Sequence, residues 1–275
     1  MRKYNPHVSH KPPASQKGEW IGIEIECFMP FRRLKIKKKE GYFDHYGDWN
    51  RGEYSYPEAR KALGKLLKGI PNITIKDDGS IKSPDEEIYF EVELSILINR
   101  NDYSPLQRLC KVLKTLDAQV NDSCGLHIHL DCRDLGFVKR IRSGNTSGSY
   151  YLYEGPGREE LLKRGSRLGK VIPLMEKMVD ASRLDNEYCE CVEPRLGSGK
   201  YRAINMDAFL EHKTIEIRLH EGTLDFKTIH NWAEFLYFVS RNKIESEVVY
   251  DFESFKKELP ESPKQILQYV KRQAA

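Results

Sequence analysis

Four segments of this sequence place acidic, histidine or arginine side chains at every second position, between aliphatic residues. Carboxylate oxygens with a minority of imidazole nitrogens suit hard divalent ions such as Mg²⁺ or Mn²⁺. A guanidinium group among them suits a phosphate or a developing negative charge. The residues concerned are Glu24, Glu26, Glu91, Glu93, His127, His129, Glu216 and Arg218.

The alternation in these segments is typical of half-buried β-strands, in which successive side chains point to opposite faces. It predicts strands over residues 19–28, 87–98, 126–131 and 212–219, each with an aliphatic face that packs on a core. For any one of these strands, a polar face turned to solvent is the simpler interpretation. Four strands with the same kind of polar face together favour a shared site.

The glutamates of these strands would share one surface if the four strands are neighbours in a single sheet. Two carboxylates ~4 Å apart repel each other by about 1 kcal/mol in water and by about 4 kcal/mol at an intermediate dielectric. Such a cluster is tolerable only if cations lie among its members. The pattern therefore predicts bound divalent ions, with Arg218 beside Glu216 facing a phosphate.

The rest of the chain predicts an α+β fold with a mostly antiparallel sheet, because strands, helices and loops follow one another without regular βαβ alternation. Pro173 should kink or split the helix in which it lies. The segment 143–157 is rich in Gly, Ser and Tyr, which suggests a lid or binding loop. Further helices and weaker strands are expected at residues 57–70, 104–120, 159–185, 228–240 and 262–272, and at 72–76 and 201–206.

The composition is that of a soluble globular protein, with 39% hydrophobic and 31% charged residues. No apolar run approaches the ~20 residues that span a bilayer, and the N-terminus has no apolar signal segment. Residues 1–17 read as a flexible leader, and residues 18–275 as a single domain. The six cysteines are scattered without paired spacing, which favours reduced thiols and a cytoplasmic location.

The basic stretch 32–39, RRLKIKKK, contributes to the net charge of +4 and could contact nucleic acid or another phosphate-rich partner. A solvated loop explains the same residues, as does an edge strand whose lysines prevent pairing with other chains. We favour this second interpretation, so nucleic acid is not the expected partner.

Seven motifs occur in the order expected of the putative amidoligase family, which the sequence resembles over roughly residues 18–240. The His-x-His after Asn-x-Ser-Cys-Gly and the Thr-x-Glu-x-Arg strand are specific in combination. The motifs are GIEIE (22–26), DDGSI (77–81), EVELSIL (91–97), NDSCGLHIHLD (121–131), SRLDNEYC (182–189), YRAINM (201–206) and TIEIRLHEGTLD (214–225).

The resemblance implies a fold similar to that of glutamine synthetase and glutamate–cysteine ligase. In such a fold an antiparallel sheet curves into a half-barrel, with helices on its convex side. ATP and two or three Mg²⁺ ions lie on the concave side. The implied activity is the ATP-dependent joining of a carboxylate to an amine, with amino acids, peptides or protein termini as substrates.

The resemblance also implies roles for individual residues. Glu24 and Glu26 resemble the metal ligands of the first strand, and either Glu91 or Glu93 resembles the ligand of the second. His127 and Glu216 resemble the pair that holds the ion bridging the nucleotide phosphates. Roles in phosphate contact or phosphoryl stabilisation are implied for Arg218, Arg202 and His129.

Two features depart from the family pattern. Ile96 stands where the second strand usually has proline, and the glutamate before it is displaced by one position, so the choice between Glu91 and Glu93 stays open. The segment 31–70 is not part of the pattern and is interpreted as an insertion.

Three further residues have two interpretations each. Asp78 belongs to an Asp-Gly turn, and it also suits metal or ammonium binding; Asp78 or Glu93 could accept a proton from the amine. Cys124 lies near two histidines, but a small buried residue explains it better than a nucleophile does. Arg183 either caps a helix end or contacts the substrate.

The expected mechanism begins with phosphorylation of a carboxylate by ATP, because a free carboxylate is a poor electrophile. An amine then displaces phosphate from the acyl phosphate to form an amide, with bound Mg²⁺ and Arg218 stabilising the phosphoryl charge. The absence of a GxxxxGK[ST] segment argues against a P-loop enzyme. The alternative is a metal-dependent hydrolase whose water is activated by an ion on His127, His129 and the carboxylates.

Overall fold

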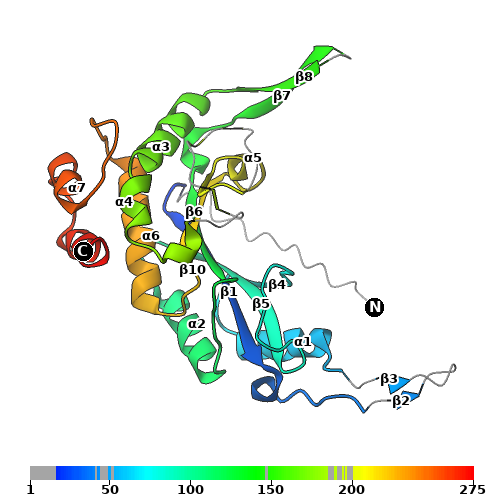
Figure 1. Cartoon of the computed structure of the whole chain (residues 1–275). Coiled ribbons are helices and arrows are strands. Elements are labelled where there is room, and N and C mark those ends of the chain that lie inside the picture. The colour runs from blue at the N-terminus through cyan, green and yellow to red at the C-terminus, as the bar shows by residue number, and fades with distance from the viewer. Residues whose placement is uncertain are drawn as a thin grey trace.

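A six-stranded sheet forms the centre of the molecule (Figure 1). The structure is a computed structural model that describes residues 17–40, 42–43, 49–50, 53–145, 148–184, 189–190, 194, 196 and 201–275. In spatial order the strands are β4 (Ile73–Lys76), β5 (Tyr89–Asn99), β1 (Trp20–Pro30), β6 (Gly125–Asp131), β10 (Thr214–Glu221) and β9 (Ile204–Asn205).

All pairings within this sheet are antiparallel, which confirms the α+β class with a mostly antiparallel sheet. The sheet is open, because β4 and β9 are its edge strands, and it does not close into a barrel. The strands that carry the predicted site residues, β5, β1, β6 and β10, are consecutive neighbours.

The aliphatic faces predicted for these four strands are buried. Ile23 of β1, Val92 of β5, Ile128 of β6 and Ile217 of β10 are all fully inaccessible to solvent. They belong to one apolar cluster to which residues of nearly every helix also contribute. Burial of this face fixes the register of each strand, because a slip of one residue would turn every apolar side chain outward.

Helices cover the apolar face, with α2 and α6 against the sheet and α7 and α8 farther out (Figure 1). The cap of α6 is Asp225, whose side chain accepts a hydrogen bond from the backbone N–H of Thr228. The buried ring of Trp232 in this helix packs against the sheet side. The helices are α1 (Tyr56–Leu66), α2 (Ser104–Thr115), α3 (Arg158–Lys170), α4 (Ile172–Glu176), α5 (Ala208–His212), α6 (Phe226–Arg241), α7 (Phe252–Glu258) and α8 (Lys264–Gln273).

The long helix expected over residues 159–185 is split, as the proline predicted. Helix α3 ends at Lys170 and α4 begins at Ile172, so Pro173 lies in the first turn of α4, where no backbone N–H is needed. A 3₁₀ turn, η4 (Ala181–Arg183), follows. Two other short 3₁₀ helices are η2 (Phe31–Leu34) and η3 (Arg133–Leu135).

The sequence predicted a lid or binding loop over residues 143–157, but most of this segment is not a loop. Most of it belongs to a hairpin of β7 (Lys139–Asn145) and β8 (Gly148–Glu154), which extends away from the sheet (Figure 1). The segment 31–70 contains η2, the short hairpin of β2 (Tyr42–Phe43) and β3 (Trp49–Asn50), and α1. The strand expected at 201–206 shortens to β9, and residues 1–16 of the expected leader lie outside the described residues.

No helix in the described part of the chain combines the length and the apolar character needed to cross a membrane.

The core position of Ile23 leads to a stability prediction. Ile23→Ala should lower the free energy of unfolding by about 2–5 kcal/mol, because it leaves a cavity beneath the central strand. Urea denaturation followed by circular dichroism measures the change. The matched control is Ile141→Ala on β7, where the side chain is 40% exposed and a change within about 0.5 kcal/mol is expected. Equal losses for both variants would contradict the placement of Ile23.

Candidate functional site

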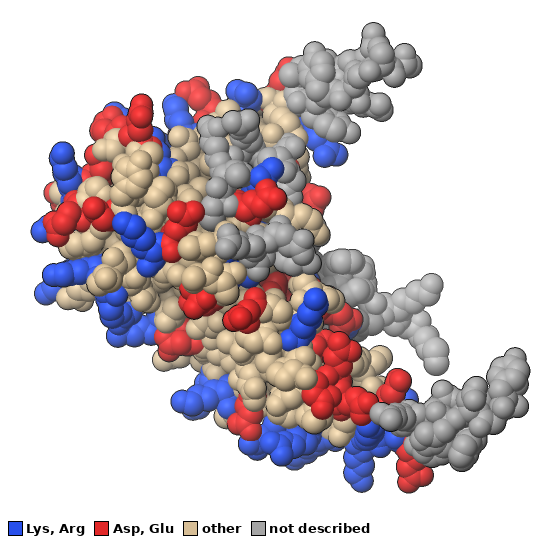
Figure 2. Space-filling model, in the orientation of Figure 1, with Lys and Arg blue, Asp and Glu red and all other residues tan. Residues whose placement is uncertain are grey.

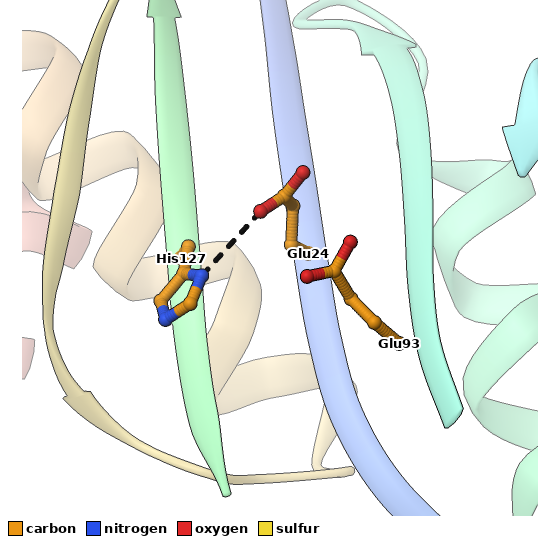
Figure 3. A group of neighbouring side chains, drawn as sticks. All are labelled: Glu24, Glu93 and His127. Atoms are coloured by element: carbon orange, nitrogen blue, oxygen red, sulfur yellow. Dashed lines mark hydrogen bonds and ion pairs between the residues drawn. The ribbon is translucent and has the colours of Figure 1, made fainter. Parts of the chain in front are cut away.

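The polar face of the sheet is assembled by the register of β1 with its two neighbours. Glu24 lies opposite His127 of β6 on one side and opposite Ser95 of β5 on the other. Two residues along, Glu26 lies opposite Glu93. Figure 3 shows the carboxylate of Glu24 between His127 and Glu93, with all three side chains on the same face.

A second row of polar residues runs beside the first. His129 lies opposite Gly22 of β1 and opposite Glu216 of β10, and Glu216 in turn lies opposite Asn205 of β9. A Cβ atom on Gly22 would lie 3.0 Å from the Cβ of His129. Glycine therefore leaves room for the histidine to lie close to the central strand.

The two histidines surround one oxygen of Glu24. Glu24 Oε2 lies 3.4 Å from Nδ1 of His127 and 3.6 Å from Nε2 of His129. On its other edge, the imidazole of His127 brings Nε2 to 3.5 Å from Oε1 of Glu26. All four side chains are largely buried, with at most 16% of any of them exposed.

Three groups of donor atoms on this face lie close enough together to hold a metal ion, with all ligand atoms of each group within 4.8 Å of one another. Carboxylate oxygens dominate each group, which suits Mg²⁺ or Mn²⁺. The buried Nε2 of His129 has no hydrogen-bond partner, so it is available as a ligand. The groups are Glu24–Glu93–His127, Glu24–His129–Glu216 and Glu26–Asp78–Glu93.

Burial and neighbouring charges act in opposite directions on the pKa values of these groups. Burial favours the neutral form of Glu24, but His129, His127 and Lys76 outweigh it and hold its pKa well below the usual value. Burial similarly opposes ionisation of Glu216, whose pKa is nevertheless lowered by His129 and Arg218. The two carboxylates in turn raise the pKa of His129 against its own burial.

Glu26 differs from the other carboxylates of the face. Burial raises its pKa, and Asp78 and Glu93 act in the same direction, against His127 and the backbone N–H of Gly125. That N–H donates to Glu26 Oε2 at 2.6 Å. A further positive charge beside this carboxyl group would lower its pKa again and favour the ionised form.

Glu216 is held in place by two donors from neighbouring positions. Arg218 Nη1 donates to its Oε1 at 2.6 Å, and Asn205 Nδ2 donates to its Oε2 at 2.6 Å. Charge-assisted hydrogen bonds of this kind fix the direction of a carboxylate. Arg218 therefore lies beside Glu216 on the site face, as the two-residue spacing predicted.

The alternation of β10 breaks immediately after Arg218. The register shifts between Ile217 and His220, so that His220 pairs with the core residue Leu126. A β-bulge of this kind adds one residue to a strand and reverses the faces beyond it. His220 consequently lies on the apolar side, 1% exposed and in edge-to-face contact with Trp232. Uninterrupted alternation from Thr214 predicts that His220 shares the polar face with Glu216 and Arg218, and this prediction is wrong.

Arg183 contacts the backbone of β10 at this bulge. Its Nη2 donates to the backbone carbonyl of Arg218 at 2.9 Å, and its side chain is only 3% exposed. The Nε of Arg183 is buried without a hydrogen-bond partner. Arg183 therefore supports the strand segment that carries Arg218.

The remaining predicted residues lie in other surroundings. Glu91 accepts a hydrogen bond from the backbone N–H of Ser83 and belongs to none of the three donor groups. Arg202 forms an ion pair with Glu190. Asp78 forms the expected turn, accepting hydrogen bonds from the N–H and hydroxyl of Ser80, and it also belongs to a donor group.

The residue that the sequence did not single out is Lys76, at the end of β4. It pairs with Glu93 in the register of the sheet and contacts two carboxylates of the face. Alternation within the weak strand 72–76, which places Thr74 and Lys76 on one face, was the available signal. A lysine on a short edge strand ordinarily prevents the sheet from pairing with another chain. The sequence alone therefore gives no reason to expect contacts between Lys76 and the carboxylates.

Among the described residues, neither the thiols nor the basic stretch belongs to the donor groups of the face. Cys124 is fully buried, and burial raises the pKa of its thiol to about 11, which does not suit a nucleophile. Arg33 and Lys38 of the basic stretch pair with Asp117 and Glu87. Figure 2 shows Lys and Arg side chains along the lower edge of the molecule, where Figure 1 places η2.

Comparison with known proteins supports the resemblance that the motifs indicated. Residues 19–150 match the model of a family described as "Putative amidoligase enzyme". The matched segment contains β4, β5, β1 and β6, and with them most of the polar face. A search of curated proteins gives no match.

Gly125 leads to a prediction about the polar face. A Cβ atom at this position would lie 2.8 Å from Nε2 of His127 and 3.3 Å from Oε2 of Glu26. Gly125→Ala should displace the imidazole and weaken Mn²⁺ binding by about ten- to a hundredfold, as changes beside metal ligands do. Calorimetric titration with Mn²⁺ measures the affinity. Gly64→Ala in α1 is the control, since its Cβ would contact only Ile75, at 3.7 Å. Unchanged Mn²⁺ affinity in Gly125→Ala would contradict the site.

Proposed function

We propose that this chain is an ATP- and Mg²⁺-dependent carboxylate–amine ligase that forms an amide bond through an acyl phosphate. The observation that carries the proposal is the set of overlapping carboxylate and imidazole groups on one sheet face, with Arg218 beside Glu216. The similarity of residues 19–150 to amidoligases supports it independently. Helices cover the other face, so the polar face is the one available for substrates.

The carboxylates and imidazoles of the polar face fit divalent ions, and we assign each residue a role as a ligand or a phosphate contact. Glu24, Glu26, His127 and Glu216 are the proposed ligands, together with Glu93 rather than Glu91, because only Glu93 shares a donor group with the others. His129 offers its unpartnered Nε2 as a further ligand or as a contact to nucleotide phosphate. When bound, the ions would neutralise phosphate charge and align the nucleotide.

The reaction proceeds in two displacements. An oxygen of the substrate carboxylate attacks the γ-phosphorus of ATP, and the bond to ADP breaks. The amine nitrogen then attacks the acyl carbon, inorganic phosphate leaves, and the nitrogen loses a proton. Arg218 stabilises the charge on the transferred phosphoryl group. Asp78 is the proposed proton acceptor, since Lys76 already pairs with Glu93.

The substrates belong to a broad class, a free carboxylate and a free amine of amino acids, peptides or protein termini. Arg202 is proposed to contact phosphate or the substrate carboxylate after exchange of its Glu190 partner. A glutamine-synthetase-like half-barrel is the arrangement expected for such a ligase, and an open antiparallel sheet with helices on one side is compatible with it.

Thermal stabilisation by nucleotide and metal together tests the proposal. ATP with Mg²⁺ should raise the melting temperature much more than either alone, because they bind the native state as one complex. Differential scanning fluorimetry gives the shifts, and ADP release over mixtures of amino acids, peptides and amines gives the turnover. Equal stabilisation by ATP in EDTA would contradict a shared site. Metal-dependent hydrolysis without any nucleotide effect would favour the hydrolase alternative.

Two substitutions on β10 should separate metal binding from phosphoryl stabilisation. Glu216→Gln keeps the shape but loses the charge, so it should raise the Mg²⁺ concentration needed for half-maximal turnover. Arg218→Lys keeps the charge but loses the planar guanidinium, so ATP should still bind while turnover falls by roughly a hundred- to a thousandfold. Steady-state kinetics at varied Mg²⁺ measures both effects. If Arg218→Lys turns over normally, this face is not where the chemistry occurs.

A further inference from the structure

Lys76 brings its ammonium group between two carboxylates of the polar face. Its Nζ lies 2.9 Å from Oε1 of Glu24 and 2.6 Å from Oε1 of Glu93. The hydroxyl of Ser95 lies 3.1 and 3.2 Å from the same two oxygens and can donate its one hydrogen to either of them. The ammonium group of Lys76 and the hydroxyl group of Ser95 therefore already lie between Oε1 of Glu24 and Oε1 of Glu93.

The two oxygens of Glu24 face opposite sides. Oε1 contacts Lys76, whereas Oε2 lies between His127 and His129. An ion held by Glu24, His129 and Glu216 can use Oε2 while Lys76 stays in place. An ion held by Glu24, Glu93 and His127 would lie between the same two carboxylates as the ammonium and would be repelled by it.

The carboxylates need this charge even without a metal ion. The side chains of Glu24 and Glu93 are only 16% and 10% exposed, so water screens their mutual repulsion poorly. Lys76 is 47% exposed, and its long aliphatic chain lets the ammonium reach the pair from the edge strand. The cross-strand pairing of Lys76 with Glu93 fixes the position from which it reaches.

We infer that Lys76 is a built-in cation that takes the place of a divalent ion between Glu24 and Glu93. The Glu24–Glu93–His127 group is then closed to metal, and the Glu24–His129–Glu216 and Glu26–Asp78–Glu93 groups stay open to it. His127 can still serve as a ligand beside Glu216, because its Nδ1 lies 3.8 Å from Oε1 of Glu216. This inference rests on the proposed function for the presence of metal ions, but not for the role of Lys76 in the metal-free protein.

The first test counts bound ions. Lys76→Met removes the charge and nearly keeps the shape, so the variant should bind one more Mn²⁺ per chain than the wild type. Electron paramagnetic resonance of free Mn²⁺ gives the count in protein first treated with EDTA. The matched control is Lys38→Met, because Lys38 lies at the same 2.9 Å from a single carboxylate, Glu87, which is 59% exposed. The control should leave the count unchanged.

The second test measures stability without any divalent ion. Lys76→Met should lower the melting temperature in EDTA by about 4 °C, and Mn²⁺ should restore it. Lys76→Arg keeps the positive charge and should behave as the wild type in both measurements. Lys38→Met should change the melting temperature little, since exposed ion pairs contribute little to stability.

The outcomes distinguish this inference from the proposed function. An unchanged Mn²⁺ count in Lys76→Met, with metal bound by the wild type, overturns the inference alone. Absence of Mn²⁺ binding by the wild type overturns the proposed function, and one ion gained by Lys76→Met would still support the inference. If Lys76→Met does not fold in EDTA, recovery of its circular dichroism in Mn²⁺ supports the inference, and failure in both conditions overturns it.

Discussion

Repulsion among buried carboxylates is the constraint on which the polar face of this protein depends. Glu24, Glu26, Glu93 and Glu216 lie on the polar face formed by the four neighbouring strands β5, β1, β6 and β10. Their side chains are mostly shielded from water. At short range and reduced dielectric, each pair costs free energy unless a positive charge lies between its members. The structure meets this need with Lys76, Arg218 and His129, whose pKa Glu24 and Glu216 raise. Every carboxylate among the proposed ligands is therefore also a residue that requires a cation.

The central position of β1 makes this arrangement possible. Its apolar side chains are fully buried, which fixes its register against β5 and β6. The same register brings Glu24 opposite His127 and Glu26 opposite Glu93. Packing on one face of the sheet thus determines the electrostatics of the other. Gly22 and Gly125 leave room for the two histidines of the face. A side chain at Gly22 would displace His129, and one at Gly125 would displace His127.

The sequence could predict the two faces of the strands because a period of two residues is a local property. It could also predict the break at Pro173, since proline lacks the N–H that a helix interior needs. Strand order is not local, so neither periodicity nor spacing could decide between Glu91 and Glu93, which share one face. The bulge that turns His220 toward Trp232 depends on tertiary packing, and the uninterrupted alternation of residues 214–220 gave no sign of it.

Lys76 was missed for a physical reason. Basic residues on edge strands commonly prevent sheets from associating, and the sequence alone cannot show that this lysine points toward acids of two neighbouring strands. A tethered ammonium differs from a divalent ion in that it binds with little entropic cost of capture and cannot be removed by a chelator. It also carries one charge rather than two, so it relieves the repulsion between Glu24 and Glu93 without attracting phosphate as strongly. On this argument the side of the face proposed to bind phosphate is the one where Glu216, His129 and Arg218 gather, away from the β4 edge.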